Sequence, residues 1–221
     1  MPRILFLLLG QFLSCILLMQ LGWGFDDVSQ FFSNPARVGL VAVALIGALA
    51  SAVLGFELHP LRKGTSAIGK QFLEIGVLWL LSLFLLWFLP FADRRRLLTI
   101  KDDYWRYVGL LLCCIAVGTR LLAMKALGGY FSAYVTLQSN HRLVQKGIYS
   151  HIRHPLYLSL LLAPAGIALV FSSILALPIL LLASVFVFDR IRKEERLLAV
   201  YFGAEFDDYE RRTWSLFPLL F

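Results

Sequence analysis

Charged residues are scarce in this 221-residue sequence: Asp, Glu, Lys and Arg make up 16% of it, against 59% hydrophobic residues. A soluble domain usually has about 25% charged residues. The shortage excludes an ordinary water-soluble fold and predicts a chain whose solvent is the lipid bilayer. The net charge of +7 is carried by Lys and Arg in loops between apolar runs. Membrane topology explains these better than a nucleic-acid partner, which we do not expect.

Cysteine and histidine are also rare. Cys15, Cys113 and Cys114 lie in apolar segments, and the adjacent pair would form a strained bridge, so no disulfide framework is expected. Among the four histidines, His151 and His154 are three apart and could share a helical face as metal ligands. Di-iron membrane desaturases and hydroxylases need many more histidines, so we expect no metal.

Two sequence signals are missing. No glycine-rich loop after a strand is visible, and the pair Gly128-Gly129 is too short to count as one. This argues against a Rossmann methyltransferase fold. The apolar stretch Ile4–Met19 after Arg3 is long enough to be read as a signal peptide, but no A-x-A-like cleavage site follows it. We therefore expect a retained helix there.

Apolar runs of about 20 residues predict an all-α, polytopic membrane protein with about six transmembrane helices. In the fourth run, Arg106 and Arg120 bracket a short uncharged core and are expected to snorkel to the interfaces. The 33 uncharged residues from Leu156 to Phe188 would form a helix about 50 Å long, so we expect a hairpin divided at Ser172-Ser173. The expected spans are Ile4–Trp23, Val38–Phe56, Phe72–Pro90, Tyr104–Ala123 and the two arms of the hairpin.

The distribution of basic residues predicts the orientation. Fifteen of the 21 Lys and Arg residues lie in the N-terminus, in loops 57–71 and 120–155, and in the C-terminal tail. Both termini are therefore expected in the cytoplasm, although Arg94, Arg95 and Arg96 count against this. Because the hairpin supplies two spans, the loop before it and the tail from Asp189 should meet at one face.

Polar residues gather before the hairpin, where His141, Arg142, Arg153 and His154 lie close in sequence. Such density beside a membrane often marks a site, but a basic loop can equally hold the chain to anionic headgroups. In the tail, Arg190 and Glu194 are four residues apart, a spacing that also suits an ordinary ion pair on a solvated helix.

Order and spacing favour a site. The sequence reads H-R-L-V from His141, then Gly147 and Tyr149, then R-H-P-L-Y from Arg153, and after the hairpin Arg190, Glu194, Glu195 and Tyr201-Phe202-Gly203. This pattern resembles the isoprenylcysteine carboxyl methyltransferase family, relatives of the phospholipid methyltransferases. The resemblance covers about residues 128–218, while the first four spans add only apolar character. It divides the chain into N-terminal helices, 1–127, and a methyltransferase-like region, 128–221.

The resemblance implies a cytoplasm-facing S-adenosylmethionine site and an apolar or lipid-like acceptor held at Arg190, with the carboxylate of a prenylcysteine as one candidate. The implied cofactor-binding residues are Gln138, His141, Leu143, Val144, Tyr149, His154, Pro155, Tyr157 and Glu194. These residue types suit the cofactor, since Glu194 offers an acid for its cationic groups and Tyr149 and Tyr157 offer aromatic faces.

Several alternatives remain open. An amine or thiol acceptor would need a base, for which His151 is the spare candidate. Glu195 lies about 100° around the helix from Glu194 and is not assigned to the site. Gly203 and Tyr209 are expected to shape and pack the tail, with Trp214, Phe217 and Phe221 as interfacial anchors. An NADPH-dependent reductase of sterol-reductase type and a non-catalytic membrane scaffold are the competing functions.

Overall fold

The structure, a computed structural model, describes residues 2–54, 68–128 and 143–217. Within these ranges every regular element is a helix, and strand-like pairing is limited to isolated bridges. The α-helices are α1 (Pro2–Trp23), α2 (Val28–Ser33), α3 (Pro35–Val53), α4 (Ile68–Arg94), α5 (Tyr104–Leu127), α6 (Pro155–Val170), α7 (Leu177–Phe202) and α8 (Ala204–Arg212). Short 3₁₀ turns occur at Phe25–Asp27, Gly147–Ser150 (η3) and Ile174–Ala176 (η4). The all-α prediction is confirmed for the described residues.

Among the described residues, four helical segments are long and apolar enough to cross a membrane: Pro35–Val53, Leu73–Arg94, Tyr104–Leu127 and Ile174–Phe202. A fifth is obtained if α1 and the segment that follows it, bent by 91°, count as one span. Helix α6 is apolar but has only 16 residues. The chain is thus an integral multi-pass protein, and the expectation of six spans exceeds what helix length establishes.

The helix boundaries differ modestly from the predicted spans. Helix α3 begins at Pro35 instead of Val38, because the Asn34 side chain accepts a hydrogen bond from the Ala36 N–H and Pro35 suits the first helical position. Helix α4 continues past Pro90 to Arg94. The predicted division of the C-terminal run is confirmed, because α6 ends at Val170 and α7 begins at Leu177.

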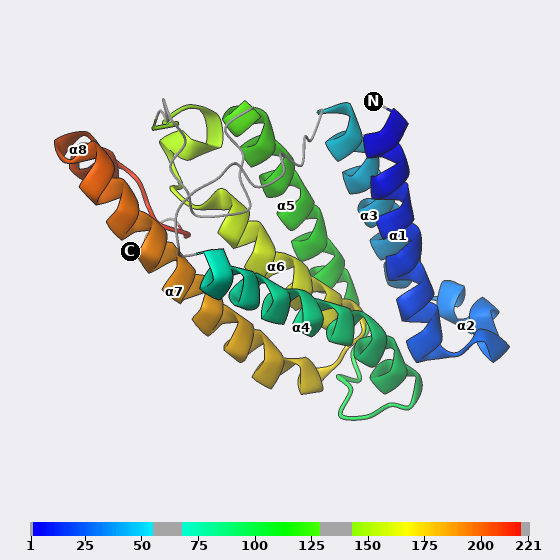
Figure 1. Cartoon of the computed structure of the whole chain (residues 1–221). Helices are drawn as coiled ribbons and strands as arrows, with labels where there is room; N and C mark the ends of the chain where they lie inside the picture. The colour runs from blue at the N-terminus through cyan, green and yellow to red at the C-terminus, as the bar shows by residue number, and fades with distance from the viewer. Residues whose placement is uncertain (1, 55–67, 129–142, 218–221) are drawn as a thin grey trace.

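Helices α5 and α6 make the most extensive contact, and α1 packs mainly on α4 and α3 (Figure 1). The α5–α6 contact depends on two glycines. A Cβ on Gly109 would lie 2.5 Å from the Gly166 carbonyl oxygen, and one on Gly166 would lie 2.6 Å from Cys113 Sγ. The two backbones therefore touch, as small residues allow between membrane helices.

The end of the bundle where α4 leads into α5 and α6 leads into α7 is held by buried charge. Arg106 donates to both Asp93 carboxylate oxygens at 2.7 and 2.8 Å and to the Val170 carbonyl at 2.7 Å. Asp93, itself buried, neutralises Arg106 within the bundle, and the exposed Asp103 accepts from Arg106 Nε at 2.9 Å. The expectation that Arg106 snorkels to the interface stays a prediction. The backbone of the 95–103 loop also pairs with Ser172 and Ile174 of the hairpin turn.

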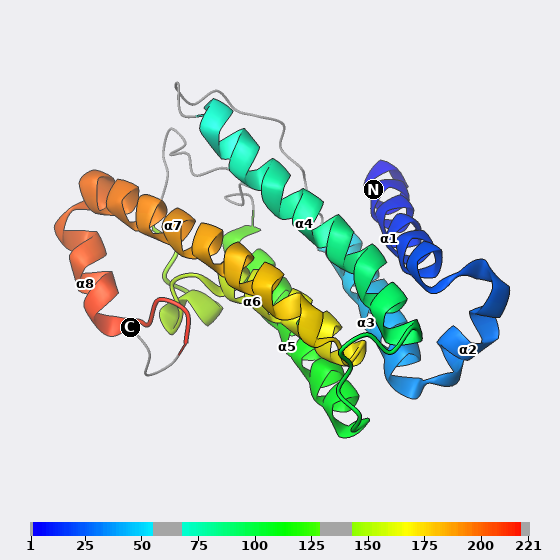
Figure 2. The ribbon, with the colours of Figure 1, turned by 90° about the horizontal axis from the view of Figure 1, so that it is seen from below.

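The opposite end of the bundle brings together the end of α5, the start of α6 and the end of α7. Helix α8 turns back from α7 at the same end (Figure 2). Gly203 makes this turn possible with φ +52°, a left-handed conformation that suits glycine. We call this end the site face, because residues of both polar sequence motifs meet there.

Candidate functional site

The central contact of the site face joins the two arms of the hairpin. Tyr157, on the first turn of α6, donates its hydroxyl to Glu194 Oε2 of α7 at 2.8 Å. The same hydroxyl accepts from Arg190 Nε at 2.8 Å. Arg190 and Glu194, one helical turn apart, are thus bridged by a tyrosine from the other motif. Arg190 is only 7% exposed, so its charge is held where the apolar span of α7 ends.

A second polar cluster lies beside the first and is centred on Glu195. Its Oε1 accepts from Arg153 Nε at 3.0 Å, and His154 Nε2 lies 3.0 Å away. Ser215 Oγ makes a longer contact to the same oxygen at 3.4 Å. Glu195 therefore holds the R-H-P-L-Y segment against α7.

The tail after α8 completes this cluster by running alongside residues 151–154. Ile152 and Trp214 form an isolated parallel bridge, and the Trp214 carbonyl accepts from the Arg153 N–H at 2.8 Å. Arg153 also donates to the Glu210 and Thr213 carbonyls at 3.0 and 2.5 Å. One arginine thereby joins α6, α7 and the tail.

Tyr149 lies in η3 and is buried. Burial, together with the nearby negative charge of Glu194, raises the pKa of the Tyr149 phenol. Its carbonyl accepts from the hydroxyl of Tyr209 on α8 at 2.8 Å. Tyr149, Tyr157 and Glu194 therefore surround one polar region, and Tyr209 packs the tail as expected.

Apolar side chains form the floor beneath these polar groups. Leu158 on α6, Val187 and Ile191 on α7, and Leu216 in the tail make a buried cluster, with Tyr157 packed on it. At the rim, Lys193 donates to Glu74 of α4 at 2.7 Å and pairs with Asp189 at 2.5 Å. The site thus lies between the apolar core of the hairpin and a rim of charged side chains.

The structure brings Tyr149, His154, Pro155, Tyr157 and Glu194 together with Arg190. Leu143 and Val144 are partly buried just before η3, while Gln138 and His141 lie outside the described residues. His151, the spare base, is exposed, and its Nδ1 lies 2.8 Å from the Ser150 hydroxyl. Among the described residues no three potential ligands are grouped for a metal.

Sequence reasoning missed the contribution of Glu195. Arg153 was read only as part of the motif, and Glu195 was left unassigned because its position on the helix did not show which neighbour it faces. Their 42-residue separation hid the pairing. The sequence signal for this contact was the adjacent pair Glu194-Glu195. Neighbouring residues on a helix point about 100° apart, so the two carboxylates face different neighbouring surfaces.

Comparison with known proteins identifies this region. The sequence model of the isoprenylcysteine carboxyl methyltransferase family matches residues 108–200. Over these residues, less than half of the chain, the sequence is similar to that family. The match begins in α5 and ends in α7, so it includes Tyr149, Tyr157, Arg190 and Glu194.

Individual relatives extend the comparison. The chain is 35% identical over 116 residues to the protein-S-isoprenylcysteine O-methyltransferase of Saccharomyces cerevisiae, covering 51% of this chain and 48% of the relative. It thus spans about half the length of that relative. It is also 35% identical over 148 residues to the cobalt-zinc-cadmium resistance protein CzcN of Cupriavidus metallidurans, covering 66% and 64%.

The fold is similar to that of a solved structure of the eukaryotic intramembrane Ras methyltransferase ICMT. The TM-score is 0.59 at 23% identity, over 93% of this chain and 74% of the other. The similarity therefore extends beyond residues 108–200 to the N-terminal helices, whose sequence alone predicted only apolar spans.

Proposed function

We propose that the protein is a membrane-embedded, S-adenosylmethionine-dependent methyltransferase that methylates the carboxylate of an apolar, lipid-like acceptor of the prenylcysteine type. The observation that carries the proposal is the hydroxyl of Tyr157 bridging Arg190 and Glu194. It holds one cation and one anion, a helical turn apart, where an apolar helix becomes polar. The family match and the yeast relative's methyltransferase name support the same activity.

The residues at the site fit the proposed cofactor. S-adenosylmethionine carries an ammonium and a sulfonium, and the carboxylate of Glu194 is the complementary charge. The rings of Tyr149 and Tyr157 offer faces to a cation or to an adenine. His154 and Pro155 hold Tyr157 at the first turn of α6, with the His154 and Tyr157 ring centroids 5.6 Å apart. Gln138, His141, Leu143 and Val144 precede this wall in sequence and complete the proposed set.

The reaction requires alignment more than acid–base chemistry. S-adenosylmethionine, when bound, supplies an electrophilic methyl group. Arg190 orients the acceptor carboxylate, which is already ionised and needs no general base. Tyr157 fixes Arg190 relative to Glu194, so the two reactants are held about one helical turn apart. Very tight binding of the acceptor carboxylate by Arg190 would lower its nucleophilicity without raising the rate. The proposed role of Arg190 is therefore to orient the acceptor carboxylate.

The proposed topology has six spans, with α6 crossing the apolar layer as the short arm of the hairpin. Both termini and the site face lie in the cytoplasm, where the cofactor is available, and the acceptor enters laterally from the bilayer. Cysteine labelling of two exposed positions tests this orientation: Lys125 in the last turn of α5, and Lys101 in the loop that precedes α5. A membrane-impermeant thiol reagent should reach K101C but not K125C in intact cells.

Calorimetric titration of the purified protein tests the cofactor. S-adenosylmethionine should bind, and binding should weaken at least tenfold in Glu194→Gln because a charge-assisted contact is lost. Asp207→Asn, an exposed acid on α8, is the matched control and should bind normally. Binding of NADPH without S-adenosylmethionine would instead favour a reductase.

A further inference from the structure

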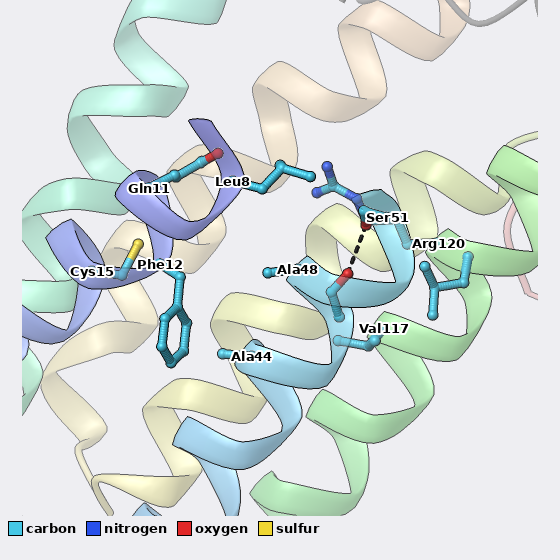
Figure 3. A pocket seen from close by; sticks show the side chains of 11 residues that line it. Leu8, Gln11, Phe12, Cys15, Ala44, Ala48, Ser51, Val117 and Arg120 are labelled. Atoms are coloured by element: carbon cyan, nitrogen blue, oxygen red, sulfur yellow. Dashed lines mark hydrogen bonds between the residues drawn. The ribbon is translucent and has the colours of Figure 1, made fainter. Parts of the chain in front are cut away.

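A cavity of about 210 Å³ lies among α1, α3 and α5, and its lining residues all belong to these three helices and not to the α6–α7 hairpin that carries the site (Figure 3). Most of its wall is apolar. The polar lining residues are Gln11, Ser51 and Arg120, and the apolar wall includes Leu8, Phe12, Ala44, Ala48 and Val117. None of these residues belongs to the site face contacts described above.

The polarity of the cavity follows its depth. Ser51 is two residues from the end of α3, and Arg120 is about 10 Å, two helical turns, from the end of α5, so both lie toward the site face. Ala44 and Val117 lie deeper on the same two helices. The cavity thus has a cationic end near the membrane surface and an apolar end inside the bundle, with Arg120 and Ser51 near each other in Figure 3.

Arg120 has no carboxylate partner within the part of the chain that the structure describes. Its situation contrasts with that of Arg106 on the same helix, which is neutralised by Asp93 at 2.7 Å. Ser51 does not provide an acceptor in compensation, because its hydroxyl donates to the Gly47 carbonyl at 2.7 Å. Arg120 is exposed, about two helical turns below the end of α5, so its unpaired guanidinium is available to an anion from outside the chain near the membrane surface.

We propose that this cavity binds one anionic phospholipid, with its phosphate on Arg120 and part of one acyl chain along Ala48, Ala44 and Phe12. The positive charge of Arg120 favours an anionic headgroup. The apolar inner end of the cavity favours a molecule with an acyl chain over a soluble anion. The volume is below the roughly 300–1,000 Å³ of pockets for drug-sized ligands, which suits a slim chain and excludes a bulky ring system.

Native mass spectrometry of the full chain released from detergent tests the proposal. Phosphatidylglycerol should remain bound at one copy, whereas phosphatidylcholine, whose headgroup is neutral overall, should not. Arg120→Gln should weaken the retained phosphatidylglycerol about tenfold, because a charge-assisted contact is lost. Lys125→Gln removes an exposed cation from the same end of α5 and should leave binding unchanged.

A second variant keeps the headgroup contact and blocks the chain. Ala48→Leu adds bulk to the apolar wall, leaves the Arg120 side chain unsubstituted and should also reduce bound phosphatidylglycerol. Equal retention in Arg120→Gln and wild type, or in Ala48→Leu and wild type, would overturn the proposal. So would displacement of the lipid by inorganic phosphate at millimolar concentration, which would indicate a site for a soluble anion.

Discussion

Tyr157 of α6 and Glu194 of α7, 37 residues apart in sequence, are joined by a 2.8 Å hydrogen bond. Because Arg190 donates to the same hydroxyl, one phenol sets the positions of both proposed reactant-binding groups. The R-H-P-L-Y and Arg190–Glu194 motifs are therefore two halves of one arrangement, which the hairpin assembles.

Replacing Tyr157 with phenylalanine keeps the ring and removes the bridge. Arg190 and Glu194 then lose a shared partner, and we expect kcat/KM for methyl transfer to fall about ten- to a hundredfold. The loss should appear in the KM of both substrates as well as in kcat. Tyr201→Phe, a similar change at an exposed position of α7, should have no effect. Normal kinetics in Tyr157→Phe would show that the bridge is not needed.

Replacing Glu195 with glutamine should act on stability first. Arg153, with a side chain only 7% exposed, would lose its closer carboxylate partner and keep only the longer contact to Glu210 at 3.4 Å, so we expect a loss of about 1–3 kcal/mol. Thermal unfolding in detergent measures this loss. Glu205→Gln, at an exposed position of α8, is the control. An unchanged unfolding temperature in Glu195→Gln would contradict a structural role for the Arg153 cluster.

The contact between α5 and α6 predicts a pair of contrasting glycine substitutions. Gly109→Ala would place a Cβ against the α6 backbone and should cost about 1–3 kcal/mol by forcing the helices apart. Gly118→Ala lies on the same helix with no atom within 4 Å of the new Cβ, so it should be neutral or slightly stabilising. Equal unfolding temperatures for the two variants would refute the close approach.

Tyr209 gives a dependence on pH. Burial raises its pKa to about 12, against about 10 in an unfolded chain. The unfolded state therefore releases this proton first, and folding stability should fall as pH rises from about 10 to 12, by up to about 2 kcal/mol. In Tyr209→Phe this component should vanish, while stability at neutral pH falls by about 1 kcal/mol with the lost hydrogen bond to Tyr149. Parallel alkaline unfolding curves for the two proteins would contradict it.

The hairpin and the meeting of the two motifs could be predicted from the sequence. A run of 33 uncharged residues is too long for one span, and Ser172-Ser173 was the place to divide it. Ser172 indeed adopts φ +48° in the turn. An even number of helices between two segments returns the chain to the same face, which is why the segments that carry Tyr157 and Glu194 were expected at one face. Their hydrogen bond was not predicted.

The buried charges could not be predicted in the same way. The pairing of Arg106 with Asp93 was not expected, because Asp93 lies in another helix and a sequence pattern alone does not pair them. Arg94, which was counted as a topology signal, is bonded to Asp26 and the Trp23 carbonyl. The Arg153–Glu195 cluster depends on the path of the tail past Ile152. That path is fixed by the isolated bridge between Ile152 and Trp214, which leaves no periodic pattern in the sequence.

Transfer of a labelled methyl group tests the central claim most directly. The purified protein, reconstituted in lipid, is incubated with methyl-labelled S-adenosylmethionine and a prenylcysteine-type carboxylate, and alkali-labile label is counted in the apolar product. We predict a methyl ester with wild type and with Arg192→Gln, an exposed neighbour on α7, and at least a tenfold loss with Arg190→Gln. No alkali-labile label in the wild-type product, despite bound cofactor, would contradict the account.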